Sequence, residues 1–149
     1  KANHIRAIKL PVAAAFHSRL VASAARPFQD AIQSAIFYHS DIPVYSNTTG
    51  RPYPADESSA KALLGRHLMN PVHFIDDIEA MYADGVDTFI EVGPKTVLTG
   101  LIRAILKGRT HAAIALDASS GKRSGIRDFG AALAHLAAAG HSVDLTAWA

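Results

Sequence analysis

The sequence contains no cysteine among its 149 residues. Disulfides, thiolate metal sites and a cysteine nucleophile are therefore excluded, and the absence fits a reducing compartment. No apolar run approaches the roughly 18 residues of a membrane span, and no continuous apolar segment of the signal-peptide type lies near the start. We therefore expect a cytoplasmic protein that does not enter a membrane.

The chain also lacks a large excess of either positive or negative charge. Lys and Arg number 15 against 13 Asp and Glu, and the basic residues are scattered along the chain. Proteins that follow a phosphate backbone gather their basic residues on one face or along one helix. Nucleic acid is therefore not an expected partner.

The composition that remains is globular. Hydrophobic residues make up 49% of the chain and charged residues 19%. These fractions are ordinary for folded domains, and the length suits one domain or a large part of one.

Strands and helices are predicted to alternate along the chain. Apolar runs bounded by turn residues predict strands at 10–16, 43–46, 88–92 and 112–116. Helical spacing predicts helices at 20–37, from Ser58 or Ser59 as cap to 69, at 74–84, at 96–106 and at about 126–139. Pro27 should bend or open the first helix, and residues 51–57, with two prolines, should form a surface loop. This alternation predicts an α/β protein.

One histidine stands where a cleft could use it. His17 follows the apolar run 10–16, and a residue at the exit of a strand can face a cleft. From the residues alone, a structural and a catalytic role both remain open. For His67 and His73 the interpretation is structural, because their spacing across Pro71 does not favour a shared metal.

Acidic residues give weaker signals. Asp76, Asp77 and Glu79 lie close together, but adjacent helical positions point apart, so we expect a solvated face. Glu91 precedes the Gly93-Pro94 turn, and a structural role in forming that turn is enough to explain the Glu91–Pro94 motif. We therefore interpret Glu91 as part of the scaffold.

Four segments carry a resemblance when taken together. They are Pro11-Val-Ala-Ala-Ala-Phe-His-Ser18, Pro43-Val-Tyr-Ser-Asn-Thr-Thr-Gly50, Arg66-His-Leu-Met-Asn-Pro-Val72, and Glu91-Val-Gly-Pro94 with Leu98-Thr-Gly-Leu101. In order and spacing the chain resembles the malonyl-CoA:acyl-carrier-protein transacylases and the acyltransferase (AT) domains of polyketide synthases, in their C-terminal portion. The resemblance covers roughly residues 10–107.

The resemblance implies a fold and a division of the chain. It implies the second half of an α/β-hydrolase-like large subdomain, a parallel sheet with flanking helices, whose start lies at the end of a ferredoxin-like small subdomain. Residues 1–10 would end the small subdomain, 11–110 would form the C-terminal half of the large one, and 111–149 would be the last strand and the linker that follows AT domains.

The resemblance also implies site residues. In the family a serine on a Gly-His-Ser-x-Gly elbow is acylated, and a histidine, here His17, acts as its base. The backbone carbonyl of His67, where a Gln is usual, would orient His17. Phe16 would favour malonyl over methylmalonyl, and Ser18 and Asn70 would bind substrate. Ala14 replaces the first His of the family's His-Ala-Phe-His pattern.

The implied reaction needs no bound cofactor and no metal. Malonyl-CoA is the substrate, and a phosphopantetheine thiol on an acyl carrier protein is the acceptor, in polyketide (antibiotic) or fatty-acid biosynthesis. The implied partners are the N-terminal half of the same domain, which carries the serine, the acyl carrier protein, and adjacent synthase domains.

A second serine motif and two other functions need weighing. Gly140-His-Ser-Val143 imitates the elbow, but Asp144 replaces the second glycine, so we expect a helix end with Gly140 as its C-cap. Two alternatives to the transferase remain open. One is a serine-hydrolase fragment of editing or thioesterase type, and the other is a non-catalytic docking or linker module.

Overall fold

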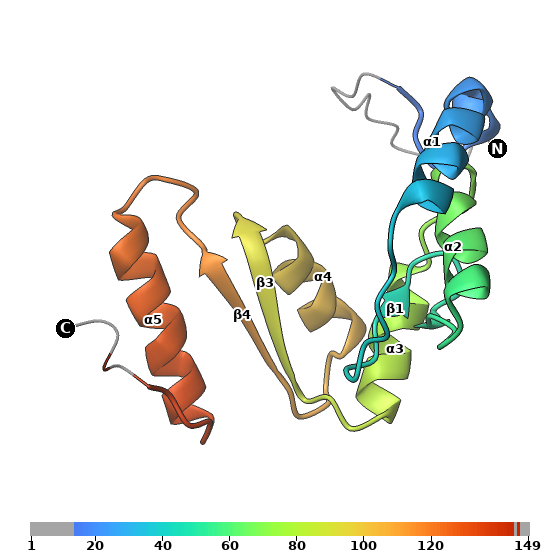
Figure 1. Ribbon diagram of the computed structural model, residues 1–149. Coiled ribbons are helices and arrows are strands. Elements are labelled where there is room, and N and C mark those ends of the chain that lie inside the picture. The colour runs from blue at the N-terminus through green and yellow to red at the C-terminus, as the bar shows by residue number, and fades with distance from the viewer. Residues whose placement is uncertain (1–13, 145, 147–149) are drawn as a thin grey trace, which may run out of the picture. The chain divides into compact units, whose positions relative to one another are not determined.

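The computed structural model describes residues 14–144 and residue 146. The chain divides into two compact units, one ending at Asp77 and the other beginning at Ile78. Helix α3 (Phe74–Ala83) contains this boundary. Both units combine helices with short strands, so the chain is an α/β protein (Figure 1).

The first unit is mainly helical. Its elements are η1 (Arg19–Val21), α1 (Ala22–Ser34), β1 (Tyr45–Ser46), β2 (Arg51–Pro52), α2 (Glu57–Gly65), η2 (His67–Met69) and the start of α3. Helix α1 packs against α2 and η2. Lys61 on α2 ties the two longer helices together, because its ammonium donates to the carbonyl of Gln33 at 3.1 Å and pairs with Glu57 at 2.6 Å.

The second unit is a βαβ arrangement with one more helix. Strands β3 (Thr88–Pro94) and β4 (Ala112–Asp117) are parallel and are joined by α4 (Val97–Ile105). Parallel neighbours need such a crossover. Helix α4 packs against both strands, and α5 (Gly125–Ala138) packs against β4 (Figure 1). Among its described residues, the buried apolar ones are Ile78, Phe89, Ile102, Leu106, Ala113, Ile114 and Ala132.

Most predicted elements are confirmed with shifted ends. Helices α1, α3, α4 and α5 and strands β3 and β4 occupy the predicted places. Helix α1 is continuous through Pro27, so the expected opening does not occur. The chain leaves α5 through Gly140, whose φ of +91° only glycine adopts readily, although the C-cap itself is Ala139. Ser142 therefore follows a helix end.

Three local predictions are wrong. Residues 14–16 lie in a bend and the start of a turn where the end of a strand was expected, and Phe16 is exposed. Arg51–Pro52, expected to be loop, pairs with β1 as a short antiparallel strand. Asp56 caps α2 in place of Ser58 or Ser59, because its carboxylate accepts from the backbone N–H of Ser59 at 2.8 Å. The predictions for residues 1–13 lie outside the described residues.

Large apolar side chains remain exposed in the second unit. Val92 on β3 is 82% exposed, and Ile90, Val97, Leu98 and Leu101 are also accessible. Within the described residues, no helix combines the length and the apolar character needed to cross a membrane.

Candidate active site

His17 is held in a strained turn of the first unit. Its φ of +60° lies in the left-handed region, which histidine tolerates better than most residues. Its backbone N–H donates to the carbonyl of Leu68 at 2.9 Å. The hydroxyl of Ser18 donates to the carbonyl of Ala15 at 2.6 Å and accepts from the N–H of Leu20 at 3.2 Å. These bonds maintain the turn and start η1.

The ring of His17 points to the backbone of η2. Its Nδ1 lies 3.1 Å from the carbonyl oxygen of His67. A carbonyl only accepts hydrogen bonds, so Nδ1 carries the proton in this contact. In the neutral ring Nε2 then keeps its lone pair, and among the described residues none hydrogen-bonds to it. The structure thus presents the nitrogen that a general base uses.

The side chain of His67 packs on the same ring. The two imidazole centroids are 4.8 Å apart, with an interplanar angle of 70°. Nδ1 of His67 lies 3.2 Å from the hydroxyl oxygen of Thr48. Burial, and secondly the charge on His17, lowers the pKa of His67. His67 therefore stays neutral at pH values where a free histidine begins to charge.

Thr48 belongs to the tight turn between β1 and β2. Ser46 is fully buried, and its carbonyl accepts from the N–H groups of Thr49 and Gly50, each at 2.9 Å. The hydroxyl of Ser46 accepts from the N–H of Thr48 at 3.3 Å. Asn47 joins this turn to the start of α3, because its carbonyl accepts from the N–H of His73 at 2.7 Å. In the sequence this stretch is one of the segments that carry the family resemblance, but no signal there marked Thr48 as a site residue.

The other residues expected at the site lie close to His17 in the chain or, for Asn70, at the C-cap of η2. Phe16 is 56% exposed and directly precedes His17. The side chain of Asn70 donates to the carbonyl of Arg66 at 2.6 Å, and its backbone N–H donates to the His67 carbonyl at 3.3 Å. The amide of Asn70, like the hydroxyl of Ser18, is engaged with local backbone.

The acidic run on α3 differs from the prediction. Asp77 is only 2% exposed, so the expectation of a solvated face is wrong for it. Its Oδ1 has no hydrogen-bond partner among the described residues. Burial, and then the charge of Asp76, raises the pKa of Asp77, while His73 opposes the shift. Local spacing contained no signal for this burial, which depends on the packing of α3.

Glu91 is part of the scaffold, as predicted. Its carboxylate accepts from the N–H of Leu98 at 3.0 Å, the N–H of Thr99 at 2.8 Å and the hydroxyl of Thr99 at 2.6 Å. Burial works to raise the pKa of Glu91, but these hydrogen bonds outweigh it and leave the pKa lowered. Glu91 therefore caps the N-terminus of α4. Elsewhere in the described part of the chain, no cluster of His, Asp and Glu is arranged to hold a metal.

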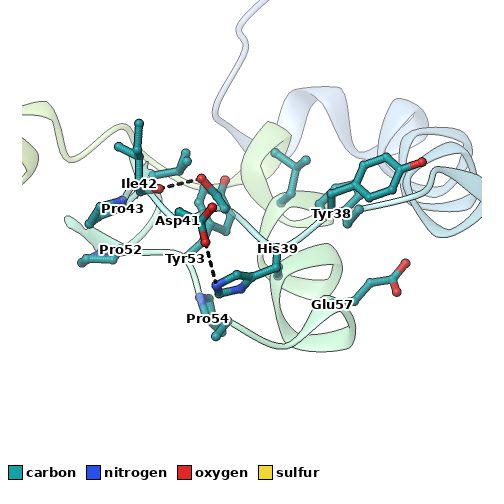
Figure 2. A pocket seen from close by; sticks show the side chains of 15 residues that line it. Tyr38, His39, Asp41, Ile42, Pro43, Pro52, Tyr53, Pro54 and Glu57 are labelled. Carbon is teal, nitrogen blue, oxygen red and sulfur yellow. Dashed lines mark hydrogen bonds and ion pairs between the residues drawn. The ribbon is translucent and has the colours of Figure 1, made fainter.

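A cavity of about 710 Å³ lies elsewhere in the first unit. Tyr38, Tyr53 and several prolines line it, and His39 and Asp41 face one another at its edge (Figure 2). None of the residues expected at the catalytic site lines this cavity. It is therefore separate from the contacts of His17.

Comparisons with known proteins give one consistent picture. No protein-family model matches the chain. A malonyl CoA-acyl carrier protein transacylase of Bacillus subtilis is 36% identical over 100 residues, which are 67% of this chain and 31% of that protein. A polyketide-biosynthesis malonyl CoA-acyl carrier protein transacylase of Bacillus velezensis is 39% identical over 107 residues, 72% of this chain and 36% of that protein.

A solved structure is similar over more of the chain. The acyltransferase domain from the second module of the salinomycin polyketide synthase superposes with a TM-score of 0.82 at 29% identity. The match covers 93% of this chain and 32% of that one. The chain thus spans about a third of the length of each of these three relatives.

Proposed function

Because this chain is homologous to part of the malonyl-CoA:acyl-carrier-protein transacylases and of polyketide synthase AT domains, we propose that it is the His-bearing C-terminal portion of such an acyltransferase. His17 is its general base. The protein transfers malonyl from malonyl-CoA to the phosphopantetheine thiol of an acyl carrier protein, through an acyl-serine intermediate. It needs no bound cofactor, and it acts alongside the other domains of a synthase.

One observation carries the proposal. Nδ1 of His17 lies 3.1 Å from a backbone carbonyl, an arrangement that supports the Nδ1–H tautomer. A carbonyl can orient imidazole in the way a carboxylate does in serine proteases, without adding a charge. Nε2 is then the basic atom, and the left-handed turn at residue 17 supports a functional site because such strain clusters where geometry matters.

The reaction runs in two half-reactions. In the first, Nε2 of His17 accepts the hydroxyl proton as the serine oxygen attacks the thioester of malonyl-CoA, and the proton then passes to the departing coenzyme A thiolate. In the second, Nε2 accepts the proton of the carrier-protein thiol as its sulfur attacks the acyl-serine. That proton returns to the serine oxygen when the ester breaks.

The serine and the oxyanion donors belong, in this proposal, to the N-terminal half of the same acyltransferase. That the chain spans about a third of its relatives is compatible with this assignment. In this proposal residues 1–10 end the ferredoxin-like small subdomain, residues 11–110 form the C-terminal half of the α/β-hydrolase-like large subdomain, and residues 111–149 are its last strand and the linker that follows.

The test is substitution of His17 in the complete enzyme. His17→Asn is the preferred variant, because asparagine tolerates the left-handed backbone at this position and has no basic nitrogen. We expect acyl-serine formation and carrier-protein loading each to slow by about 10²- to 10⁴-fold. His135→Asn, at an exposed position of α5, is the matched control. Unchanged transfer in the His17 variant would refute the assignment, and release of malonate to water without carrier loading would identify a hydrolase.

A further inference from the structure

A single hydrogen bond does not fully orient an imidazole ring. The contact between Nδ1 of His17 and the His67 carbonyl fixes one atom of the ring. The ring can still swing about that contact, and Nε2 lies on its far side and moves most. Catalytic groups need tighter control, because displacements of about 1 Å cost about 100-fold in rate. Something else must restrain the swing.

The side chain of His67 is placed to do this. Its ring packs against that of His17 at a centroid separation of 4.8 Å and an interplanar angle of 70°. An edge-to-face contact of this kind places the His67 ring beside the His17 ring and limits its rotation. Because burial lowers the pKa of His67 and favours its neutral form, the His67 ring does not repel the imidazolium that His17 becomes when it accepts a proton.

The His67 ring is itself held by one hydroxyl group. The Oγ1 of Thr48 lies 3.2 Å from Nδ1 of His67 and fixes the rotation of that ring. Thr48 is immobilised by the buried Ser46, whose hydroxyl accepts from the Thr48 N–H. The contacts therefore run in order from Ser46 through Thr48 and the His67 ring to the His17 ring.

We propose that Thr48 is a positioning residue for His17, acting through the side chain of His67. This inference rests on the proposed function, since it assigns Thr48 to the same site. In this arrangement residue 67 has two roles. Its carbonyl accepts from Nδ1 of His17 and so selects the tautomer, and its imidazole, held by Thr48, keeps the His17 ring aligned with that carbonyl and so sets the direction of Nε2.

The first test is spectroscopic and requires no turnover. The ¹⁵N shifts of the His17 ring in the full chain report which nitrogen is protonated. Thr48→Val removes the hydroxyl at nearly constant volume, and we expect it to move the His17 ring away from the pure Nδ1–H form. Thr48→Ser keeps the hydroxyl and should restore the wild-type shifts. Thr49→Val is the matched control, because the neighbouring Thr49 is exposed and, among the described residues, is held by a backbone hydrogen bond to Ser46 and not by its side chain.

The second test is kinetic and uses the complete enzyme. Loss of the partner that orients a metal-binding histidine typically costs about 10- to 100-fold, and we use the lower end of that scale for His17. We expect Thr48→Val to lower kcat by about tenfold with KM for malonyl-CoA unchanged, and Thr48→Ser to recover most of the loss. In a His67→Gln background, which keeps the carbonyl but removes the ring, Thr48→Val should have no further effect on kcat.

The outcomes separate the two proposals. If Thr48→Val lowers the melting temperature but leaves the His17 ring shifts and kcat unchanged, Thr48 is merely structural and the inference is overturned. An equal effect of Thr49→Val, or a full effect of Thr48→Val in the His67→Gln background, also overturns it. If His17→Asn leaves transfer intact while Thr48→Val still moves the ring shifts, the proposed function fails and the positioning contact stands.

Discussion

A β-carbon on Gly50 would lie 2.5 Å from the β-carbon of Asp76 and 3.3 Å from its backbone carbon. Carbon atoms in contact normally stay about 3.5–4.0 Å apart. The turn that holds Thr48 therefore touches α3 so closely that only glycine fits, and its φ of +64° adds a second reason.

Gly50→Ala should destabilise the chain by about 2 kcal/mol or more, because the clash and the left-handed backbone act together. Denaturant unfolding followed by circular dichroism measures this change. Gly93→Ala is the control, because in the described part of the chain no atom lies within 4 Å of the added carbon there. If the two variants unfold at the same denaturant concentration, the close approach to Asp76 does not matter.

Asp77→Asn should stabilise the chain at neutral pH, because it replaces a buried carboxylate that has an unpartnered oxygen with a neutral amide. The raised pKa gives the sign of the pH dependence. Protonation of Asp77 favours the folded state, so its stabilising contribution is complete below the ordinary value of 3.8 and is lost as pH rises through the raised pKa. The difference in the free energy of unfolding between variant and wild type should thus widen as pH rises above 3.8.

Melting temperatures at several pH values check this prediction. Asp30→Asn provides the comparison, because Asp30 is exposed on α1 and forms a surface pair with Arg26. A gap for Asp77→Asn that stays constant with pH would show that Asp77 titrates as an ordinary surface carboxylate.

Glu91→Ala should cost about 1–3 kcal/mol, because it removes the acceptor for two backbone N–H groups and a buried hydroxyl at the start of α4. Glu91→Gln keeps one acceptor oxygen and should cost less. The lowered pKa means that the charged form stabilises the fold above the ordinary value of 4.5, and that this stability is lost as pH falls through the lowered pKa.

Acid unfolding curves measure the effect of Glu91. The glutamine variant should show a smaller loss of stability between neutral and acid pH than wild type does. Asp30→Asn, at an exposed position of α1, serves as the control for general loss of negative charge. Equal acid sensitivity of wild type and Glu91→Gln would argue against the capping role.

Phe16→Ser should relax extender-unit choice in the complete enzyme, if the proposed function holds. Exclusion of one methyl group by a rigid ring is worth about 1–3 kcal/mol, or about 10- to 200-fold in kcat/KM. Competition between malonyl-CoA and methylmalonyl-CoA measures the ratio. Leu20→Ser removes another exposed apolar side chain nearby and should leave the ratio unchanged. An unaltered ratio in the Phe16 variant would remove this residue from the site.

The regular elements were predictable because their signals are local. The β-branched stretch at β3 and the helical spacing of α3 depend on neighbouring residues alone, and both elements are present. The contact between His17 and His67 could be anticipated only through the resemblance, since the two residues are 50 positions apart.

Features that depend on packing could not be predicted. The burial of Asp77 and the short β1–β2 pairing arise from contacts that no local pattern records. The cap of α2 was misplaced by a short distance because Asp56, Ser58 and Ser59 are all good N-cap residues, and the backbone of the preceding loop decides among them. The left-handed turn at His17 escaped prediction for a similar reason, because its partners lie on η2.

The accessible apolar side chains of β3 and α4 affect how these predictions are measured. With Val92 at 82% exposure and Leu101 at 47%, the native chain already offers surface to dyes that report apolar groups. Dye fluorescence would start high before any unfolding, and a melting curve recorded that way would understate the transition. Circular dichroism and calorimetry, which sense backbone order and heat, are the appropriate methods for this molecule.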